Sequence, residues 1–191
     1  MRTVIFGGAN SLDNFLARPD GGVDWLRWND GAAAIMKKMW RSIDTMLMGR
    51  KTYEVARRMA PHRKTSKTAR PSKRKAKTDA DAIPDVSTYV FSRTLPDEPG
   101  VAIVREDVGS FVRRLKAEPG KDILVMGGGE LARSLFEANL IDRVGFNIHP
   151  VLLGAGVPAF HPMSHQIDLE LVECGPLGNG CVYVDYRVLH V

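Results

Sequence analysis

Two turns in the sequence combine glycine with the predicted start of a helix, an arrangement that binds phosphate. The apolar segment 46–48 runs into the turn 49–52, which reads Gly-Arg-Lys-Thr, and the apolar segment 123–126 runs into the turn 127–130, which reads Gly-Gly-Gly-Glu. Glycine lets a ligand approach the backbone, and the first turn of a helix offers unpaired N–H groups and a partial positive charge. Each turn is therefore a candidate anion site, and two such sites in one sheet suit a ligand with several phosphates, such as a dinucleotide. Plain turn chemistry is the alternative interpretation of each turn taken alone.

A third polar segment directly follows another predicted strand. Residues 91–94 read Phe-Ser-Arg-Thr. Arginine binds a phosphate monoester through two parallel hydrogen bonds and hydroxyl groups add further donors, so this segment is a candidate cradle for such a group. A solvated loop with one surface arginine is the alternative.

One further pattern matches a known dinucleotide fingerprint without its context. Gly127-x-Gly129-x-x-Ala132 has the glycine spacing of the doubly wound dinucleotide fold. That fingerprint follows the first strand and precedes an acidic residue by about 20 positions. Here it comes late in the chain, and Asn147 and His149 lie near that offset. We therefore do not predict the doubly wound fold.

Strands and helices alternate along the chain and place these turns at strand ends. The period of apolar residues predicts helices at 30–42, 52–59, 108–117 and 130–138. Strands are predicted at 4–6, 45–48, 87–91, 101–104, 123–126 and 144–151, with a closing hairpin of 169–173 and 182–189. A polar loop is expected from residue 7 to about residue 22. This order predicts a single α/β domain over residues 1–191, with an antiparallel edge to its sheet.

The positive charge of the chain is concentrated in one segment. Residues 61–78 hold eight basic residues and no acidic one, and since the whole chain carries +5, the remainder carries −3. Residues 61–82 contain no apolar side chain larger than alanine, so burial there cannot offset the entropy of ordering, and we expect a disordered insertion. Nucleic acid is an alternative partner for this insertion, although it lacks the interleaved aromatic residues of single-strand binders.

Composition narrows the class of protein. A chain of 191 residues with 44% hydrophobic residues fits one globular domain. No apolar run reaches the roughly 18 residues that a membrane span needs, and no secretory signal is recognisable, so we expect a cytoplasmic protein. Cys174 and Cys181 flank a glycine-rich turn and could face each other across it, but two free thiols are the preferred interpretation. No cluster of cysteine and histidine predicts a metal site.

Four motifs in a fixed order resemble the dihydrofolate-reductase superfamily. Its cofactor motifs are matched by Leu-Met-Gly-Arg-Lys-Thr-Tyr-Glu at 47–54, Phe-Ser-Arg-Thr-Leu at 91–95 and Gly-Gly-Gly-Glu-Leu at 127–131. The tail at 149–160, His-Pro-Val-Leu-Leu-Gly-x-Gly-x-Pro-x-Phe, is similar to one branch, the C-terminal reductase domain of the bifunctional riboflavin-biosynthesis deaminase–reductase. The resemblance covers nearly the whole chain outside the basic insertion.

The resemblance implies a three-layer fold, with a mixed, mostly parallel central sheet, helices on both faces and a C-terminal antiparallel hairpin. It implies NADPH as the cofactor, and often a homodimer. The implied activity is hydride transfer to a small pyrimidine- or pteridine-like substrate, similar to 5-amino-6-(5-phosphoribosylamino)uracil reductase. The implied cofactor-binding residues are Ala9, Gly49, Arg50, Lys51, Thr52, Ser92, Arg93, Gly127, Gly128, Gly129, Glu130 and Leu131. Substrate contacts are expected from Asn10, Asp13 and Trp25.

The sequence departs from the superfamily at its carboxylate. Dihydrofolate reductases carry an acidic residue on the helix before the Gly-Arg motif, and that position falls near Ala33, which argues against dihydrofolate as the main substrate. Asp13, Asp24 and Asp30 remain as candidate catalytic acids, although aspartate is also common in turns and caps. Asn14 replaces a glycine of the branch, and asparagine tolerates the left-handed backbone.

Two alternatives to a reductase stay open. The missing carboxylate motivates a module that binds NADPH without catalysis. The basic insertion motivates a nucleic-acid accessory protein.

Overall fold

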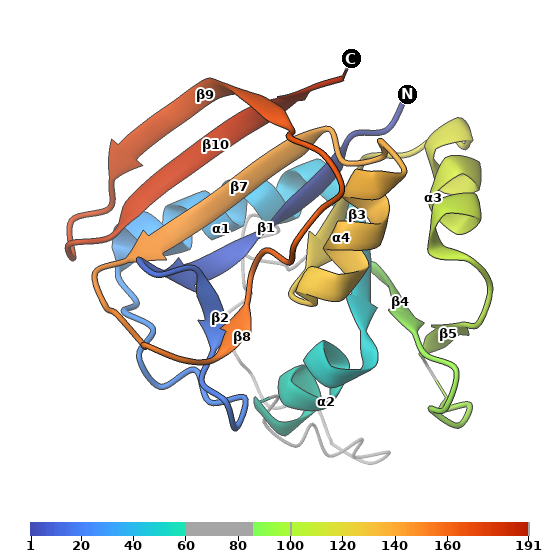
Figure 1. Ribbon diagram of the computed structural model, residues 1–191, viewed down its shortest axis with the longest axis horizontal. Coiled ribbons are helices and arrows are strands. Elements are labelled where there is room, and N and C mark those ends of the chain that lie inside the picture. Colours follow the sequence, from blue (N-terminus) through green and yellow to red (C-terminus); the bar gives the residue numbers. More distant parts are fainter. Residues whose placement is uncertain (60–85, 100, 191) are drawn as a thin grey trace, which may run out of the picture.

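The chain forms one large sheet flanked by helices on both faces (Figure 1). The computed structural model describes residues 1–59, 86–99 and 101–190, so the predicted insertion at 61–82 lies outside the described residues. The sheet has eight strands in the order β5-β4-β3-β6-β1-β7-β10-β9. Its strands are β1 (Val4–Ser11), β3 (Ile43–Gly49), β4 (Ser87–Phe91), β5 (Ala102–Val104), β6 (Asp122–Met126), β7 (Arg143–His149), β9 (Asp168–Pro176) and β10 (Val182–Leu189).

Most neighbouring strands of this sheet run parallel. β5, β4, β3, β6, β1 and β7 pair in parallel, whereas β10 pairs antiparallel with both β7 and β9. Parallel strands covered on both faces read as continuous apolar runs, as in Ile123 to Met126 of β6. The prediction of a mixed, mostly parallel sheet with a C-terminal antiparallel hairpin is confirmed.

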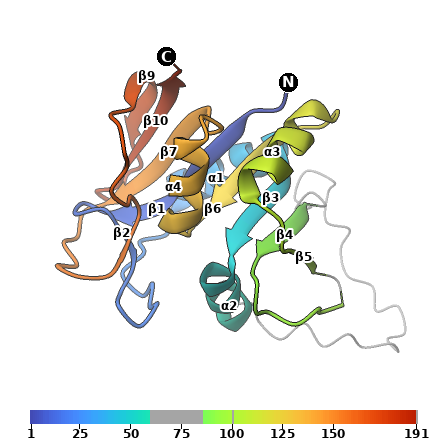
Figure 2. The same cartoon turned by 45° about the vertical axis from the view of Figure 1, so that its right-hand side comes forward.

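The helices form two further layers. They are α1 (Asp30–Ser42), α2 (Arg50–Met59), α3 (Val108–Ala117) and α4 (Gly129–Glu137). Figures 1 and 2 show α3 and α4 side by side over one face of the sheet and α1 over the other, while α2 contacts β3 and β4. The carboxamide of Asn29 and the carboxylate of Asp107 cap α1 and α3, each accepting a backbone N–H at 2.8 Å. None of these described helices is long and apolar enough to cross a membrane.

The two faces of the sheet are packed to different degrees. Beneath α3 and α4, Phe6 is fully buried and meets Phe136, Phe146 and Phe160 edge-to-face, at centroid distances of 5.9, 5.1 and 5.7 Å. Beneath α1 the buried cluster is small and is built around Ala32 of that helix. Four of the five apolar residues that predicted α1 stay only half-buried, namely Ile35, Met36, Met39 and Trp40, whereas Ile43 is fully buried at the start of β3.

The expected polar loop between residues 7 and 22 was wrong in part. β1 continues to Ser11 because it pairs with β7 along its whole length, from Ile5 opposite Arg143 to Ser11 opposite His149. A short strand, β2 (Phe15–Ala17), then pairs antiparallel with β8 (Val157–Pro158) in a separate two-stranded sheet. Backbone pairing with distant strands thus overrides local polarity.

The two cysteines do not face each other across the hairpin. Cys174 is exposed and lies opposite Val184, whereas Cys181 is buried in the cluster beneath α1. Both are free thiols.

Candidate functional site

The two glycine turns meet at the carboxyl ends of adjacent strands. β3 and β6 pair in parallel, so the turns that follow them emerge side by side. A Cβ atom at Gly127 would lie 2.6 Å from Thr52 Oγ1, and a Cβ atom at Gly128 would lie 3.8 Å from the backbone nitrogen of Gly49. Gly127 and Gly128 have φ angles of 60° and 61°, which glycine adopts without strain. The structure therefore joins the first and third motifs into one backbone surface.

The amino end of α4 is open for a ligand. Gly128 is its N-cap and makes no side-chain capping bond, which leaves the first helical N–H groups for another acceptor. Behind it, Gly129 packs against the tail motif, because a Cβ atom there would lie 2.7 Å from Pro158 O and 2.8 Å from Ala159 O. Glu130 is exposed, and Leu131 packs against the main core.

The second motif joins the same edge. Gly49 lies opposite Phe91 in the β3–β4 pair, so Ser92 and Arg93 follow directly beside the first turn. The Ser92 hydroxyl accepts the backbone N–H of Leu95 at 2.9 Å, which shapes a tight turn. Arg93 is exposed, and its guanidinium contacts no hydrogen-bonding or charged partner among the described residues.

The two cations of the first turn, Arg50 and Lys51, differ in whether they have a charged partner. Arg50 forms an ion pair with Glu54 at 2.7 Å, one helical turn along α2. Lys51 is exposed, and within the described ranges its ammonium has no ion pair. Lys51 and Arg93 are therefore available to neutralise a phosphate.

Ala9 and Asn10 lie at the end of β1, in the strand next to β6. Ala9 is opposite Asn147 of β7, and both are half-buried. Asn10 is 2% exposed and donates from Nδ2 to Asn14 Oδ1 at 3.0 Å. Asn14 has a φ angle of 64°, so the left-handed turn expected at this position is confirmed.

Asp13 fastens a loop. Its carboxylate accepts hydrogen bonds from Ser11 Oγ at 2.5 Å and from the backbone nitrogens of Leu153 and Gly154 at 3.1 and 2.8 Å. The Ser11 bond and these backbone bonds lower the pKa of Asp13 below its usual value. The group therefore stays ionised at neutral pH and ties β1 to the tail motif.

The other two candidate acids lie in different local settings. Asp24 is exposed and pairs with Arg18 at 2.7 Å, which lowers the pKa of Asp24. Asp30 is an exposed residue in the first turn of α1, where a negative charge suits the helix dipole. Each has a local structural partner or role of its own.

Trp25 packs on a buried imidazole that the sequence did not single out for chemistry. Trp25 is 8% exposed, and its ring meets His149 edge-to-face at 5.3 Å. His149 Nδ1 accepts the backbone N–H of Arg27 at 3.2 Å and lies 3.3 Å from Cys181 Sγ. Burial, and then the charge of Arg27, lower the pKa of His149, so the ring is neutral at physiological pH.

Three buried polar side-chain atoms lack a hydrogen-bond partner within the part of the chain that the structure describes. They are Asn10 Oδ1, Trp25 Nε1 and Asn147 Oδ1. An unpaired buried polar atom costs about 1–3 kcal/mol, so such atoms are rare without a ligand or a function. All three lie at the carboxyl ends of β1 and β7 or in the loop packed on β7. Asn10 and Trp25 were predicted as substrate residues, whereas Asn147 was noted only for its spacing. A polar residue within an apolar strand was the feature of the sequence that could have singled out Asn147.

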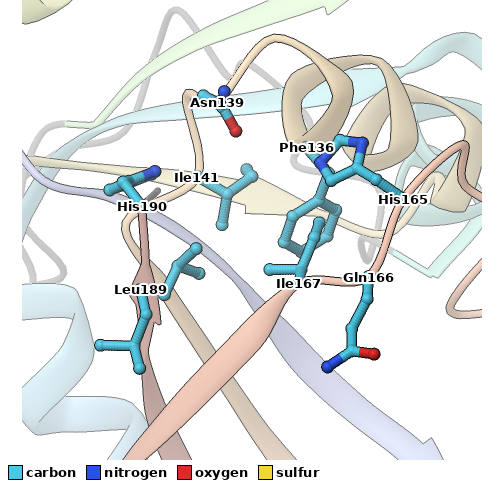
Figure 3. Close-up of a pocket in the computed structure, with 9 residues that line it drawn as sticks. Phe136, Asn139, Ile141, His165, Gln166, Ile167, Leu189 and His190 are labelled. Carbon is cyan, nitrogen blue, oxygen red and sulfur yellow. The ribbon is translucent and has the colours of Figure 1, made fainter.

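A small cavity lies elsewhere, at the far end of α4 (Figure 3). Its volume is about 90 Å³. Its lining comes from the carboxyl end of α4, the segment before β9 and the end of β10: Phe136, Asn139, Ile141, His165, Gln166, Ile167, Val188, Leu189 and His190. The glycine turn begins α4 and this cavity borders its end, so the two are separate. No group of three or more potential ligands that could hold a metal occurs among the described residues.

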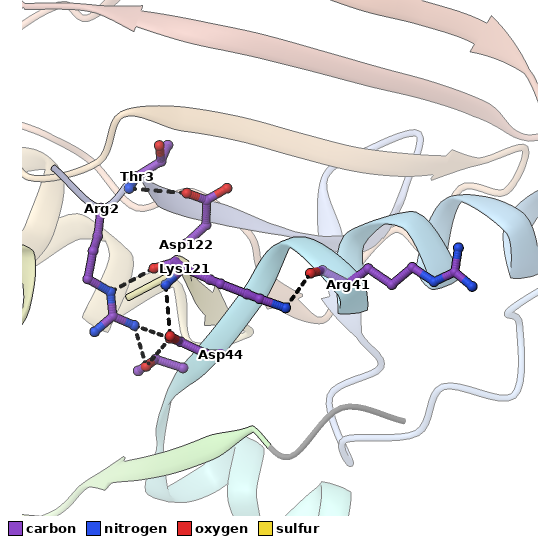
Figure 4. A network of polar contacts seen from close by, with 7 residues as sticks. Arg2, Thr3, Arg41, Asp44, Lys121 and Asp122 are labelled. Atoms are coloured by element: carbon purple, nitrogen blue, oxygen red, sulfur yellow. Dashed lines mark hydrogen bonds and ion pairs between the residues drawn. The ribbon is translucent and has the colours of Figure 1, made fainter. Parts of the chain in front are cut away.

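The amino ends of the strands carry an ion-pair network instead of a site (Figure 4). Arg2 is 7% exposed; its guanidinium pairs with the Asp44 carboxylate, and Nε donates to Lys121 O at 2.6 Å. Lys121 donates its backbone N–H to Asp44 at 2.8 Å and its ammonium to Arg41 O at 2.9 Å. This network joins the starts of β1, β3 and β6.

Comparisons with known proteins agree with this geometry. The family described as RibD C-terminal domain matches residues 2–183. Two uncharacterised proteins of Bacillus subtilis (strain 168) are each 30% identical: YyaP over 97% of this chain and 95% of its own length, and YwjB over 89% and 88%.

Solved structures share the fold. A candidate riboflavin biosynthesis protein from Shewanella sp. PV-4 superposes with a TM-score of 0.74 at 22% identity, covering 98% of this chain and 99% of its own. A second structure is the Thermotoga maritima diaminohydroxyphosphoribosylaminopyrimidine deaminase/5-amino-6-(5-phosphoribosylamino)uracil reductase. Its TM-score is 0.68 at 19% identity, covering 98% of this chain and 57% of its own. Dihydrofolate reductase from Enterococcus faecalis, complexed with NADP(H), has a TM-score of 0.63 at 15% identity, covering 97% of this chain and 96% of its own. The fold is that of dihydrofolate reductase, and the chain belongs to the family of RibD C-terminal domains.

Proposed function

We propose that this protein is an NADPH-dependent reductase of a small pyrimidine- or pteridine-like compound, similar to 5-amino-6-(5-phosphoribosylamino)uracil reductase. The observation that carries the proposal is the meeting of two glycine turns, with Thr52 beside Gly127, next to Lys51 and Arg93, which form no ion pair with any described residue. Family membership and the resemblance to a dihydrofolate reductase complexed with NADP(H) support it.

The residues at this edge fit a dinucleotide phosphate. Gly127 and Gly128 leave no Cβ atoms in the way of a diphosphate, and the open amino end of α4 presents N–H groups to it. We assign the diphosphate to Gly49, Arg50, Lys51 and Thr52 together with Gly127, Gly128, Gly129, Glu130 and Leu131, and the 2′-phosphate to Ser92 and Arg93. Ala9 would border the nicotinamide carboxamide.

The reaction divides between cofactor and protein. A reduced nicotinamide supplies a hydride when bound, and the chain supplies alignment and a dry surface. We assign the substrate contacts to Trp25 and Asn10, both more than nine-tenths buried. Asp13 holds the tail motif in place, and because its pKa is lowered it serves position rather than proton donation.

The test compares cofactors and one variant. NADPH should bind the purified protein tighter than NADH, followed by nicotinamide fluorescence and by thermal shift. Arg93→Ala should weaken NADPH about 10- to 100-fold and leave NADH nearly unchanged, because charge-assisted hydrogen bonds contribute about 1.5–3 kcal/mol. Equal losses for both cofactors would remove the role assigned to Arg93, and absence of any NADPH response would refute the proposed function.

A non-catalytic cofactor-binding module is the second candidate. It rests on α1, where Ala33 is exposed and stands at the position of the superfamily carboxylate. NADPH binding without NADPH oxidation across a panel of pterins, pyrimidines and quinones would favour this candidate over the reductase.

We further propose a homodimer in the cytoplasm. β9 is an edge strand, and its exposed Leu169 and Leu171 are two residues apart, so they share one face of that strand. Apolar residues grouped on a sheet face are typical of interfaces. Light scattering on a sized sample tests the dimer directly.

A further inference from the structure

Two of the three unpaired buried atoms lie on the same face of the sheet. Asn147 and His149 are two residues apart on β7, and side chains alternate along a strand, so both face α1. Trp25 packs on His149, which places the indole at the end of that face. Ala9 lies opposite Asn147 on the neighbouring strand and shares the face as well.

These two atoms are complementary in hydrogen-bond character. Trp25 Nε1 can only donate a hydrogen bond, whereas Asn147 Oδ1 can only accept one. The protein therefore offers one free donor and one free acceptor beside the position assigned to the nicotinamide. A ligand that fills both needs a carbonyl group and an N–H group, as on the edge of a cyclic amide.

Neighbouring side chains already have other partners, so Asn147 Oδ1 has no hydrogen-bond partner in the part of the chain that the structure describes. Tyr183 lies opposite Asn147 on β10, but its hydroxyl donates to Asp185 at 3.4 Å and lies over Gly145, where a Cβ atom would approach it to 3.6 Å. Asp185 is 3% exposed and is ion-paired with Arg143. The hydroxyl is thus turned along β7 toward Gly145 and away from the strand end.

The Trp25 indole is held just as firmly. His149 Nδ1 is engaged by the Arg27 N–H and by Cys181 Sγ, so the imidazole that supports the indole cannot turn freely. Ala9, Asn147 and Tyr183 are all half-buried, although Asn147 Oδ1 itself is buried, so a ligand that pairs with this oxygen must displace the side chains that cover it.

We propose that Asn147 and Trp25 are specificity-determining residues of the substrate site: Asn147 Oδ1 accepts a ring N–H of the substrate, and Trp25 Nε1 donates to its ring carbonyl. This inference rests on the proposed function, which supplies the position of the nicotinamide beside Ala9. Because the two residues have different roles, substituting each one should have a different effect on substrate binding.

The experiment uses two probes that differ only at their ring nitrogens. 5,6-Diaminouracil carries both ring carbonyls and ring N–H groups, whereas 5,6-diamino-1,3-dimethyluracil keeps the carbonyls and has methyl groups in place of the N–H groups. Binding of each probe is measured by calorimetry on the full chain saturated with NADPH, after NADPH binding itself has been established. The wild-type protein should prefer the unmethylated probe by about tenfold or more, because a site built to pair an N–H rejects an analogue without it.

Each variant should change a different quantity. Asn147→Leu should reduce the preference between the probes to about twofold or less, with NADPH affinity unchanged. Its melting temperature without probe should equal or exceed that of the wild type, because the variant removes an unpaired buried oxygen. Trp25→Phe keeps an aromatic ring on His149 and should weaken both probes about equally, since both retain the carbonyls.

The outcomes are distinguishable from failure of the proposed function. If NADPH does not bind, the proposed function fails first. If NADPH binds but the wild type responds to neither probe or does not discriminate between them, the inference is overturned and the proposed function stands. A preference that survives in Asn147→Leu, or a lower melting temperature with an unchanged preference, shows that Asn147 is structural and also overturns it.

Discussion

The two ends of the sheet satisfy their polar groups in different ways. At the amino ends, Arg2 and Asp44 are paired with each other and with their neighbours, and Lys116 closes on Asp142 at 2.5 Å. At the carboxyl ends, Asn147 Oδ1 and Trp25 Nε1 are buried and have no hydrogen-bond partner among the described residues, and Lys51 and Arg93 form no ion pair with any of those residues. The described polar groups are thus mutually paired at one end and partly unpaired at the other, as expected if unsatisfied groups persist where a ligand completes them.

The largest effect on stability is expected when Arg2 is removed from the ion-pair network at the amino ends of the strands. Arg2→Met keeps most of the volume but leaves Asp44 without its cationic partner, and breaking a buried pair costs about 3 kcal/mol of unfolding free energy. Urea unfolding measures the loss, and NADPH affinity in the folded variant should be unchanged. Arg18→Met is the matched control, since its pair with Asp24 is exposed and screened by solvent, so its loss should leave the unfolding free energy nearly unchanged. A parallel loss of NADPH affinity in Arg2→Met would contradict the separation of the two ends.

A smaller effect is expected at the glycine turns. Gly127→Ala brings a Cβ atom to 2.6 Å from Thr52 Oγ1 in a backbone with φ of 60°, so the turn must shift. NADPH should bind at least tenfold more weakly, while unfolding free energy falls by only about 1–2 kcal/mol. Gly175→Ala is the control, because a Cβ atom there meets nothing within 4 Å. Equal effects of the two substitutions on NADPH would show that the turn carries no ligand.

The smallest effect concerns pH. Because burial lowers the pKa of His149 below 6.5, the folded chain keeps this ring neutral while the unfolded chain takes up a proton as the pH falls through about 6.5. The contribution of this group to stability is therefore complete well above pH 6.5 and declines as the pH falls through and below that value. Urea midpoints at pH 7.5 and 5.5 should differ less in His149→Gln than in the wild type. An identical pH slope in both proteins would show that the neutral imidazole does not contribute.

Local patterns in the sequence were enough to predict most of the fold. The apolar period located all four described helices to within two residues at each end, and the strands that follow strong apolar runs were found. β2 and β8 were missed because strands of three and two residues are too short to show an apolar period. Only their pairing with each other makes them strands. Pairing of this kind depends on parts of the chain more than 100 residues apart.

The candidate site divides in the same way. The two glycine turns could be proposed as phosphate sites from the sequence because their residue types are local to single motifs. The partnership of Trp25 with His149 spans 124 positions, and the unpaired oxygen of Asn147 depends on where the Tyr183 hydroxyl turns. No spacing in the sequence encodes either fact, and the roles of Asp13, Asp24 and Asp30 likewise depended on partners visible only in three dimensions.

The contact between Thr52 and Gly127 has an evolutionary consequence. Each position limits the size of the other, because the threonine fills the space that any side chain at 127 would need. The two positions should therefore vary together among relatives: a larger residue at 127 requires glycine or alanine at 52. Two motifs 75 residues apart would then be inherited as one unit, and covariation between them would be the trace of that constraint.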